Sequence, residues 1–373
     1  MGCAVSRITY EKLGILVTDF PAYKDNGTTS GDLIRVQSFN YGFQHPAIDI
    51  KEIGSDSLVL RNGESPILRQ PEVTCEINYL FSSGQNEQAI GLYNNSDGSV
   101  FKNFFEADST DDINIVAVGA NDRDLRDLNF VEKNGFSGYH VIGFGNCFLK
   151  NYSYSAEVGS LPESTISYAG SNLKFDIYNP EEVPSLPSVK LGVNNPFSEE
   201  RLYLDENSFS ESLQEEANAI MPGDMIVEIT KKAGEYGGAP LESVHAAIQS
   251  VNINLPVDRQ DIFGFGSNYV FDRKLKLPII ASADINMIVR EYSTGQIESF
   301  FREGSRYEIL IKHTDRSHQK GTLAEANAIQ NIAIDNAQLK SQSFTNQIGG
   351  QSNVSSSFSF GVSVSKGLRI YDK

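Results

Sequence analysis

The chain has 373 residues, a formal net charge of −17 and a hydrophobic content of 40%. This length predicts two or three domains, and the hydrophobic content is high enough to give each domain a core. An acidic chain is poorly suited to gripping nucleic acid, because phosphate contacts need clustered Lys and Arg. The sequence has no run of eighteen apolar residues, so no membrane-spanning segment is expected.

Most of the predicted elements are strands. Alternating or continuous apolar runs predict strands at residues 112–118, 225–229, 306–312 and 357–364. In the last of these, Ser359, Gly361 and Ser363 share one face, and the apolar residues between them share the other. Helical spacing and capping signals predict short helices at residues 85–92, 205–221 and 322–334.

The chain contains an internal repeat. Residues 37–41 (QSFNY) return as residues 249–253 (QSVNI), 212 positions later. Residues 142–159 match residues 332–349 at a distance of 190 positions, with six identities in eighteen, where composition alone would give about one. A duplicated unit within one chain is typical of proteins that form a symmetric assembly from similar units. The repeat predicts equivalent strand positions for Ile142 and Ile332, for Leu149 and Leu339, and for Val158 and Ile348.

A proline-rich stretch indicates the domain boundary. Residues 180–187 contain three prolines in eight positions, which disfavours both helix and sheet pairing. We therefore expect a first β domain at residues 1–178, a Pro-rich linker at residues 179–204 and a second β domain at residues 205–373.

Motifs for catalysis or metal binding are weak throughout. The five histidines include no H-E-x-x-H pair, and a solvated loop is expected at His313 and His318. The G-F-G turns at residues 143–145 and 264–266 lack the third glycine of a dinucleotide-binding turn. Cys75 and Cys147 lie in apolar runs and are expected to be buried thiols. We predict no catalytic, cofactor-binding or metal-binding residues, no cofactor and no enzyme activity.

One stretch is similar to a known family. Residues 148–162 (FLKNYSYSAEVGSLP), followed by residues 167–172 (SYAGSN), resemble a segment of the tail tube, or major tail, proteins of long-tailed bacteriophages. In that family the segment forms a strand, a V-G-x-x-P turn and a return strand. Residues 83–92 (SGQNEQAIGL) resemble the family's passage from strand to helix. The second copy departs from the pattern, because residues 350–352 (GQS) replace residues 160–162 (SLP).

The resemblance implies a mostly β chain with two tandem tail-tube-like β-sandwich or barrel domains, each with a short flanking helix. In the family, six such domains form a ring whose inner sheets join into one barrel, and stacked rings form the tube for genome ejection. A chain with two domains closes the same ring as a homotrimer. The implied partners are further copies of the chain and the tape measure, terminator and baseplate proteins. The implied location is the virion tail, assembled in the host bacterial cytoplasm.

Physical arguments agree with this interpretation. Open sheet edges either aggregate or pair by design, and ring closure pairs every edge. An acidic chain suits a conduit through which DNA passes without specific binding, because like charge repels phosphate. The alternatives that stay open are a baseplate hub or distal tail ring protein, a β-sandwich glycan hydrolase, and a carbohydrate-binding or cell-surface module.

Overall fold

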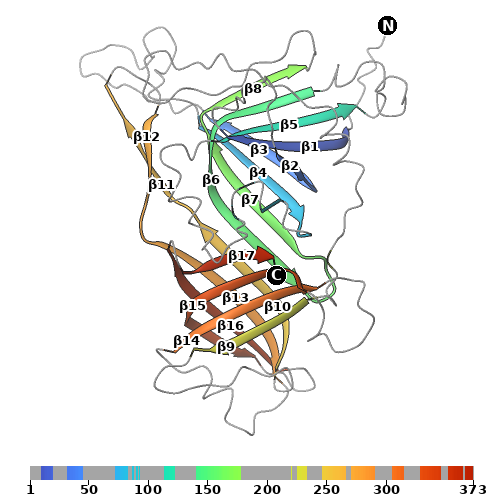
Figure 1. The fold of residues 1–373 in the computed structure, drawn as a ribbon, viewed down its shortest axis with the longest axis vertical. Helices are drawn as coiled ribbons and strands as arrows, with labels where there is room; N and C mark the ends of the chain where they lie inside the picture. The colour runs from blue at the N-terminus through green and yellow to red at the C-terminus, as the bar shows by residue number, and fades with distance from the viewer. Residues whose placement is uncertain are drawn as a thin grey trace, which may run out of the picture.

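The structure is a computed structural model. It describes residues 10–19, 32–44, 72–82, 86–87, 90, 92, 113–121, 140–177, 220, 225–232, 246–265, 270–289, 305–314, 328–345, 352–363 and 366–372. The described part is almost entirely strand, which confirms the mostly β prediction (Figure 1). No helix in the described part is long and apolar enough to cross a membrane.

The strands of the N-terminal half form a first set. They are β1 (Tyr10–Asp19), β2 (Asp32–Arg35), β3 (Ser38–Gln44), β4 (Glu72–Leu80), β5 (Ile113–Asn121), β6 (His140–Glu157), β7 (Glu163–Gly170) and β8 (Asn172–Ile177). Their pairing order is β3-β4-β7-β6-β5-β1-β2, and β8 also pairs with β6. Every one of these pairings is antiparallel.

The strands of the C-terminal half form a second set. They are β9 (Met225–Lys231), β10 (Ala246–Pro256), β11 (Arg259–Phe263), β12 (Val270–Leu275), β13 (Ile279–Val289), β14 (Arg306–Thr314), β15 (Ala328–Thr345), β16 (Asn353–Val362) and β17 (Leu368–Asp372). Their order is β10-β13-β16-β15-β14-β9, and β17 also pairs with β15. The first set has the same order in β3-β4-β7-β6-β5-β1 and carries β2 as an additional strand beyond β1. β11 and β12 form a separate hairpin.

The register of the pairings repeats as well as their order. Leu149 pairs with Tyr168 and Leu339 pairs with Phe358, and each ladder then shifts by one residue. The sequence repeat is therefore confirmed in the structure at Leu149 and Leu339. The same offset places Ile142 on Ile332, because both lie in the preceding halves of β6 and β15. The proposed equivalence of Val158 with Ile348 stays a prediction, because residue 348 lies outside the described residues.

One long strand in each set changes its pairing partners along its length. β6 pairs with β5 and β8 over its first half and with β7 over its second, and β15 does the same with β14, β17 and β16. The change of partners occurs near Asn146 (φ 52°) and Asn336 (φ 59°), which lie 190 positions apart. Asn tolerates the left-handed conformation better than most residues. One Asn in each set therefore lies where the long strand exchanges its partner strands.

A continuous hydrophobic core lies beneath both sets. In β16, Phe358, Phe360 and Val362 are buried while Ser359 and Gly361 face outward, which confirms the predicted alternation. The strands predicted at residues 112–118, 225–229 and 306–312 are also confirmed, as β5, β9 and β14. Apolar–polar alternation fits β14 and β16, whose apolar side chains lie mainly on one face, whereas β5 is a continuous apolar run that is buried on both faces.

The helix predicted over residues 322–334 is wrong from Ala328 onward, where the chain forms β15. Ile332 and Ile334 on one face of the strand and Ala333 on the other are at most 2% exposed, and β14 and β17 pair with its two edges. A strand with apolar residues on both faces reads as a continuous apolar run, which periodicity does not separate from a buried helix.

The other flanking helices are described only in part. Asn86 and Glu87 have helical backbone, and the N–H of Ile90 donates to the carbonyl of Asn86 at 3.2 Å, as in one helical turn. Of the helix predicted at residues 205–221, only Ile220 is described, and it is not helical. The linker predicted at residues 179–204 lies outside the described residues, so the domain division stays a prediction.

Candidate assembly interface

The two strand sets join through one antiparallel strand pair. The second half of β6 pairs with β10, from Asn151 opposite Pro256 to Glu157 opposite Ser250. In Figure 1, β6 descends from the first set toward the second. The pair creates one continuous row of strands in the order β3-β4-β7-β6-β10-β13-β16-β15. We call this row the inner sheet.

On the buried face of this junction, a tyrosine of the first set forms a hydrogen bond with a histidine of the second set. Tyr154 of β6 lies opposite Ile253, and each is 1% exposed. The Tyr154 hydroxyl lies 2.8 Å from Nε2 of His313 in β14. Nδ1 of the same ring lies 3.2 Å from the main-chain carbonyl of Gln330, so Nδ1 donates to that carbonyl and Nε2 accepts the tyrosine proton. Burial lowers the pKa of His313 to about 4, which keeps the ring neutral at pH 7.

This position of His313 corrects the expectation of a solvated loop. His313 is 0% exposed, at the end of β14. The signal was present in the sequence, because Ile309, Ile311 and His313 share one face of a period-two strand. His318 lies outside the described residues.

The opposite face of the inner sheet is polar. Asn151, Ser153 and Ser155 line it on β6, and Ser355, Ser357 and Ser359 line it on β16. At the junction the Ser155 hydroxyl donates to Oδ1 of Asn252 at 2.7 Å. Five exposed carboxylates stand on this face: Glu72, Glu76, Glu157, Glu163 and Asp284. Among the described paired positions of this face none holds Lys or Arg, while the exposed Lys150 and Lys340 stand at the ladder shifts at one end.

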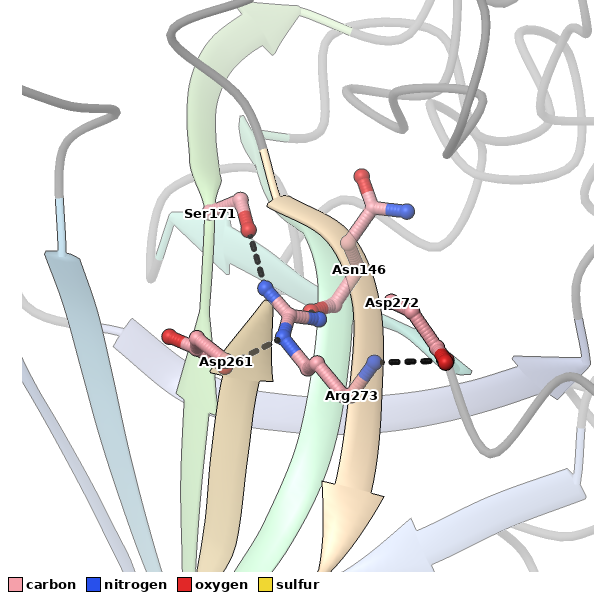
Figure 2. A network of polar contacts seen from close by, with 5 residues as sticks. All are labelled: Asn146, Ser171, Asp261, Asp272 and Arg273. Carbon is pink, nitrogen blue, oxygen red and sulfur yellow. Dashed lines mark hydrogen bonds and ion pairs between the residues drawn. The ribbon is translucent and has the colours of Figure 1, made fainter. Parts of the chain in front are cut away.

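An arginine clamp adds a second link between the sets. The β11–β12 hairpin extends from the second set alongside the first (Figure 1). Figure 2 shows Arg273 of β12 donating through Nη1 to the carbonyl of Asn146 at 2.9 Å and through Nη2 to the Ser171 hydroxyl at 2.6 Å. The guanidinium carbon lies 4.5 Å from the ring centroid of Phe148, and Nε lies 3.3 Å from Oδ1 of Asp261. The side chain of Arg273 is 4% exposed, so the clamp is a desolvated, charge-assisted contact.

The two ends of the inner sheet are open edges. Among the described residues, β3 pairs only with β4, and β15 pairs only with β16 over Ser341–Thr345. Large side chains on these edges are about half exposed: Tyr41 46%, Phe43 43% and Phe344 52%. The equivalent positions of the internal junction hold residues that are at most 1% exposed: Ile253, Leu255 and Tyr154. The apolar positions that are buried at the internal junction are therefore half exposed at the two open edges.

A buried carboxyl group lies beneath the junction strand. Glu87 is 1% exposed, and its Oε1 accepts hydrogen bonds from the hydroxyls of Tyr79 at 2.7 Å and Tyr152 at 3.4 Å. The hydroxyl of Tyr152 also lies 3.3 Å from that of Ser164. Burial raises the pKa of Glu87 to about 7, and the two tyrosine hydrogen bonds only partly oppose the rise. The motifs around residue 87 did not identify this group, because its hydrogen-bond partners come from the distant strands β4 and β6.

The remaining candidates from the sequence have structural roles. Cys75 and Cys147 are buried free thiols, as expected, and burial raises the pKa of the Cys75 thiol. In the described part of the chain, no group of three or more His, Cys, Asp or Glu side chains is placed to hold a metal ion. Gly145 of the first G-F-G turn lies within β6, beside the bend at Asn146.

Comparison with known proteins identified no relative of the chain. No protein-family model matches the chain, and no curated protein matches its sequence.

Proposed function

We propose that the chain is a self-assembling structural protein of the virion, the tail tube subunit of a long-tailed bacteriophage. In this proposal three chains close a pseudo-sixfold ring, and stacked rings form the conduit for genome ejection. The observation that carries the proposal is the β6–β10 junction, because each chain already contains one example of the contact that such a ring repeats.

The two open edges, β3 and the end of β15, match the two strands of the internal junction, so they can pair with each other between chains. β3 is equivalent to β10 and β15 is equivalent to β6, through the repeat in strand order and register. Pairing β3 of one chain with β15 of the next therefore copies the internal contact. In that register Phe344 lies opposite Tyr41 of the next chain, as Tyr154 lies opposite Ile253. The exposed aromatic side chains of both edges become buried, which favours association.

Ring closure follows from the kind of interface. A head-to-tail contact between unlike edges generates either a closed ring or an open filament. With two equivalent units in each chain, a ring of six units contains three internal junctions and three junctions between chains. Internal junctions form at high effective concentration, which favours complete rings.

The polar face supports a conduit for DNA. If the inner sheet closes as a barrel, this face lines the lumen, and its carboxylates repel phosphate groups. Glu76 pairs with Asn40, and the equivalent Asp284 pairs with Asn252. A three-chain ring would therefore carry six carboxylates at one level. In this role the other partners are the tape measure, terminator and baseplate proteins of the tail.

A disulfide cross-link tests the predicted register. Ser155 and Asn252 are opposite each other between two hydrogen-bonded positions of the ladder, Val158 with Gln249 and Lys150 with Val257. They are thus a non-hydrogen-bonded pair, whose short Cα separation of about 4.5 Å is compatible with a disulfide. The equivalent pair between chains is Thr345 with Asn40, so Asn40→Cys combined with Thr345→Cys should form a covalent trimer under mild oxidation.

The matched control moves one cysteine by two residues along the same face of β15. Asn40→Cys combined with Ser343→Cys should cross-link far less, and both pairs should be tested in a Cys3→Ser background. Native mass spectrometry should give three chains per ring, and electron microscopy should show tubes rather than isolated rings. A stable monomer at high concentration, a six-chain ring, or equal cross-linking of both pairs would contradict the proposal.

A further inference from the structure

We propose that Phe344 of one chain packs into an aromatic site on the next chain, and that this site selects against the tyrosine of the internal junction. The aromatic site is formed by Tyr41 of β3, Phe144 of β6 and Phe175 of β8. The inference rests on the ring proposed above. It names the residues that make the end of β15 choose β3 and the end of β6 choose β10, which strand pairing alone does not specify.

The aromatic site is a cluster of rings beside the open edge of β3. The ring centroid of Tyr41 lies 5.9 Å from that of Phe144 and 5.9 Å from that of Phe175. Phe144 is 0% exposed, whereas Tyr41 and Phe175 are 46% and 58% exposed. Aromatic rings attract one another in tilted and edge-to-face arrangements at centroid separations of about 4.5–7 Å. The two exposed rings therefore suit a further aromatic side chain.

The second set has isoleucine at each of these three positions. The ladder registers equate the members of the aromatic site with residues of the second set as follows: Tyr41 with Ile253, Phe144 with Ile334 and Phe175 with Ile370. The three isoleucines are at most 1% exposed, and Ile253 lies opposite Tyr154 of the first set. The aromatic residues thus stand only in the set whose edge strand is open.

A fourth difference concerns the internal hydrogen bond. Gly119 of β5 and His313 of β14 pair with residues that lie 190 positions apart on β6 and β15, so the two positions are equivalent. Tyr154, which bonds to His313, has Phe344 as its counterpart on β15. Both members of the hydrogen bond are therefore replaced together. The site without an imidazole receives a side chain without a hydroxyl.

These replacements make the two junctions selective. If the end of β15 paired with β10, Phe344 would leave Nε2 of the buried His313 without its hydrogen-bond partner. If the end of β6 paired with β3, the hydroxyl of Tyr154 would face the buried Gly119, which has no side chain to bond it. Each mismatch buries one unsatisfied polar group, and the matched junctions avoid this cost. Pairing of like sets is disfavoured, so first and second sets alternate around the ring.

The test measures ring dissociation of the full chain by sedimentation. Phe344→Tyr adds only a hydroxyl and should raise the dissociation constant about tenfold to a hundredfold, the cost of burying one unsatisfied polar group. Phe175→Ser should raise it at least as much, although β8 takes no part in the pairing of β3 with β15. Phe265→Tyr and Phe265→Ser are the matched controls, because this fully exposed side chain lies outside the aromatic site, and neither should change the dissociation constant.

A second-site change distinguishes the missing hydrogen bond from a lack of space. Gly119→His combined with Tyr41→Ile gives the first set two residues of the internal site. In this background, chains with Phe344→Tyr should form rings more tightly than chains that keep Phe344, which reverses the preference of the wild type. If Gly119→His unfolds the chain, the Phe344 and Phe175 variants decide the inference without it.

The outcomes separate the two proposals. If wild-type chains form no rings, the proposed function fails and this inference fails with it. If wild-type rings form and either Phe344→Tyr or Phe175→Ser dissociates like its Phe265 control, the aromatic site is wrong while the ring stands. Dissociated chains with Phe344→Tyr should melt like wild type, because the side chain is 52% exposed. A lower melting temperature would place this ring in the core of its own chain and overturn the inference.

Discussion

Replacing Glu87 by Gln should remove a pH dependence from the stability of the chain. The carboxyl group is 1% exposed, it accepts from Tyr79 and Tyr152, and its Oε2 has no hydrogen-bond partner among the described residues. Gln keeps the acceptor at Oε1 and the shape of the side chain, but it carries no charge at any pH.

The magnitude follows from the pKa of this group. Its value rises from the usual 4.5 to about 7, because burial disfavours the charged form. The folded state therefore holds a proton that the unfolded state releases between these two values. Stability is highest below about pH 4.5 and falls as the pH rises toward 7, where ionisation of the buried group becomes part of folding. A rise of that size corresponds to about 3 kcal/mol at most, at about 1.4 kcal/mol for each pH unit.

Urea unfolding of dissociated chains at pH 5 and pH 8 measures this effect. Glu87→Gln should have a stability close to that of wild type at pH 5, and it should exceed wild type at pH 8 by up to about 3 kcal/mol. Glu76→Gln is the control, because it removes an exposed carboxylate from the polar face of the same strand set. If Glu87→Gln and wild type lose stability in parallel between the two pH values, the assignment of Glu87 as a buried proton-binding group is refuted.

Three further predictions concern the edges, the junction and one turn. Phe344→Ser should leave the melting temperature of the chain nearly unchanged and prevent ring formation, because the side chain is 52% exposed on the open edge. The control is Ile280→Ser, which removes a 57% exposed side chain from the polar face and should still give rings in native mass spectra. Tyr154→Phe should cost about 1–3 kcal/mol in urea unfolding, because Nε2 of the buried His313 loses its hydrogen-bond partner. Tyr168→Phe should cost little, because that hydroxyl has no hydrogen-bond partner among the described residues, and equal losses would contradict the role of the Tyr154–His313 bond. Gly367→Ala should lower the melting temperature, because φ is +121° and the new Cβ would lie 2.8 Å from Cα of Val362. Gly361→Ala is the control and should remain stable, because no atom lies within 4 Å of the Cβ that it would add.

The sequence by itself located four of the described strands and identified residues that correspond between the two copies. Apolar–polar alternation located β14 and β16, because a strand with one buried face repeats its apolar residues at every second position, and short continuous apolar runs located β5 and β9. The offset of 190 positions identified Leu149 and Leu339 as corresponding residues. In the structure, the strand ladders shift by one residue after each of them. Local periodicity failed at residues 328–334, where both faces of the strand are buried.

Only the tertiary structure decided which edge of the first set meets the second. The pairing of β6 with β10 joins Tyr154 to His313, 159 positions later in the chain, and Arg273 reaches Asn146 across 127 positions. Contacts at such distances depend on how two sheets stack and bend, and no local pattern of side chains specifies that. The burial of Glu87 has the same origin, because its hydrogen-bond partners Tyr79 and Tyr152 come from two strands, β4 and β6, that are far apart in the sequence. Periodicity shows which face of a strand is covered, whereas the partner that covers it emerges only when distant strands are packed together.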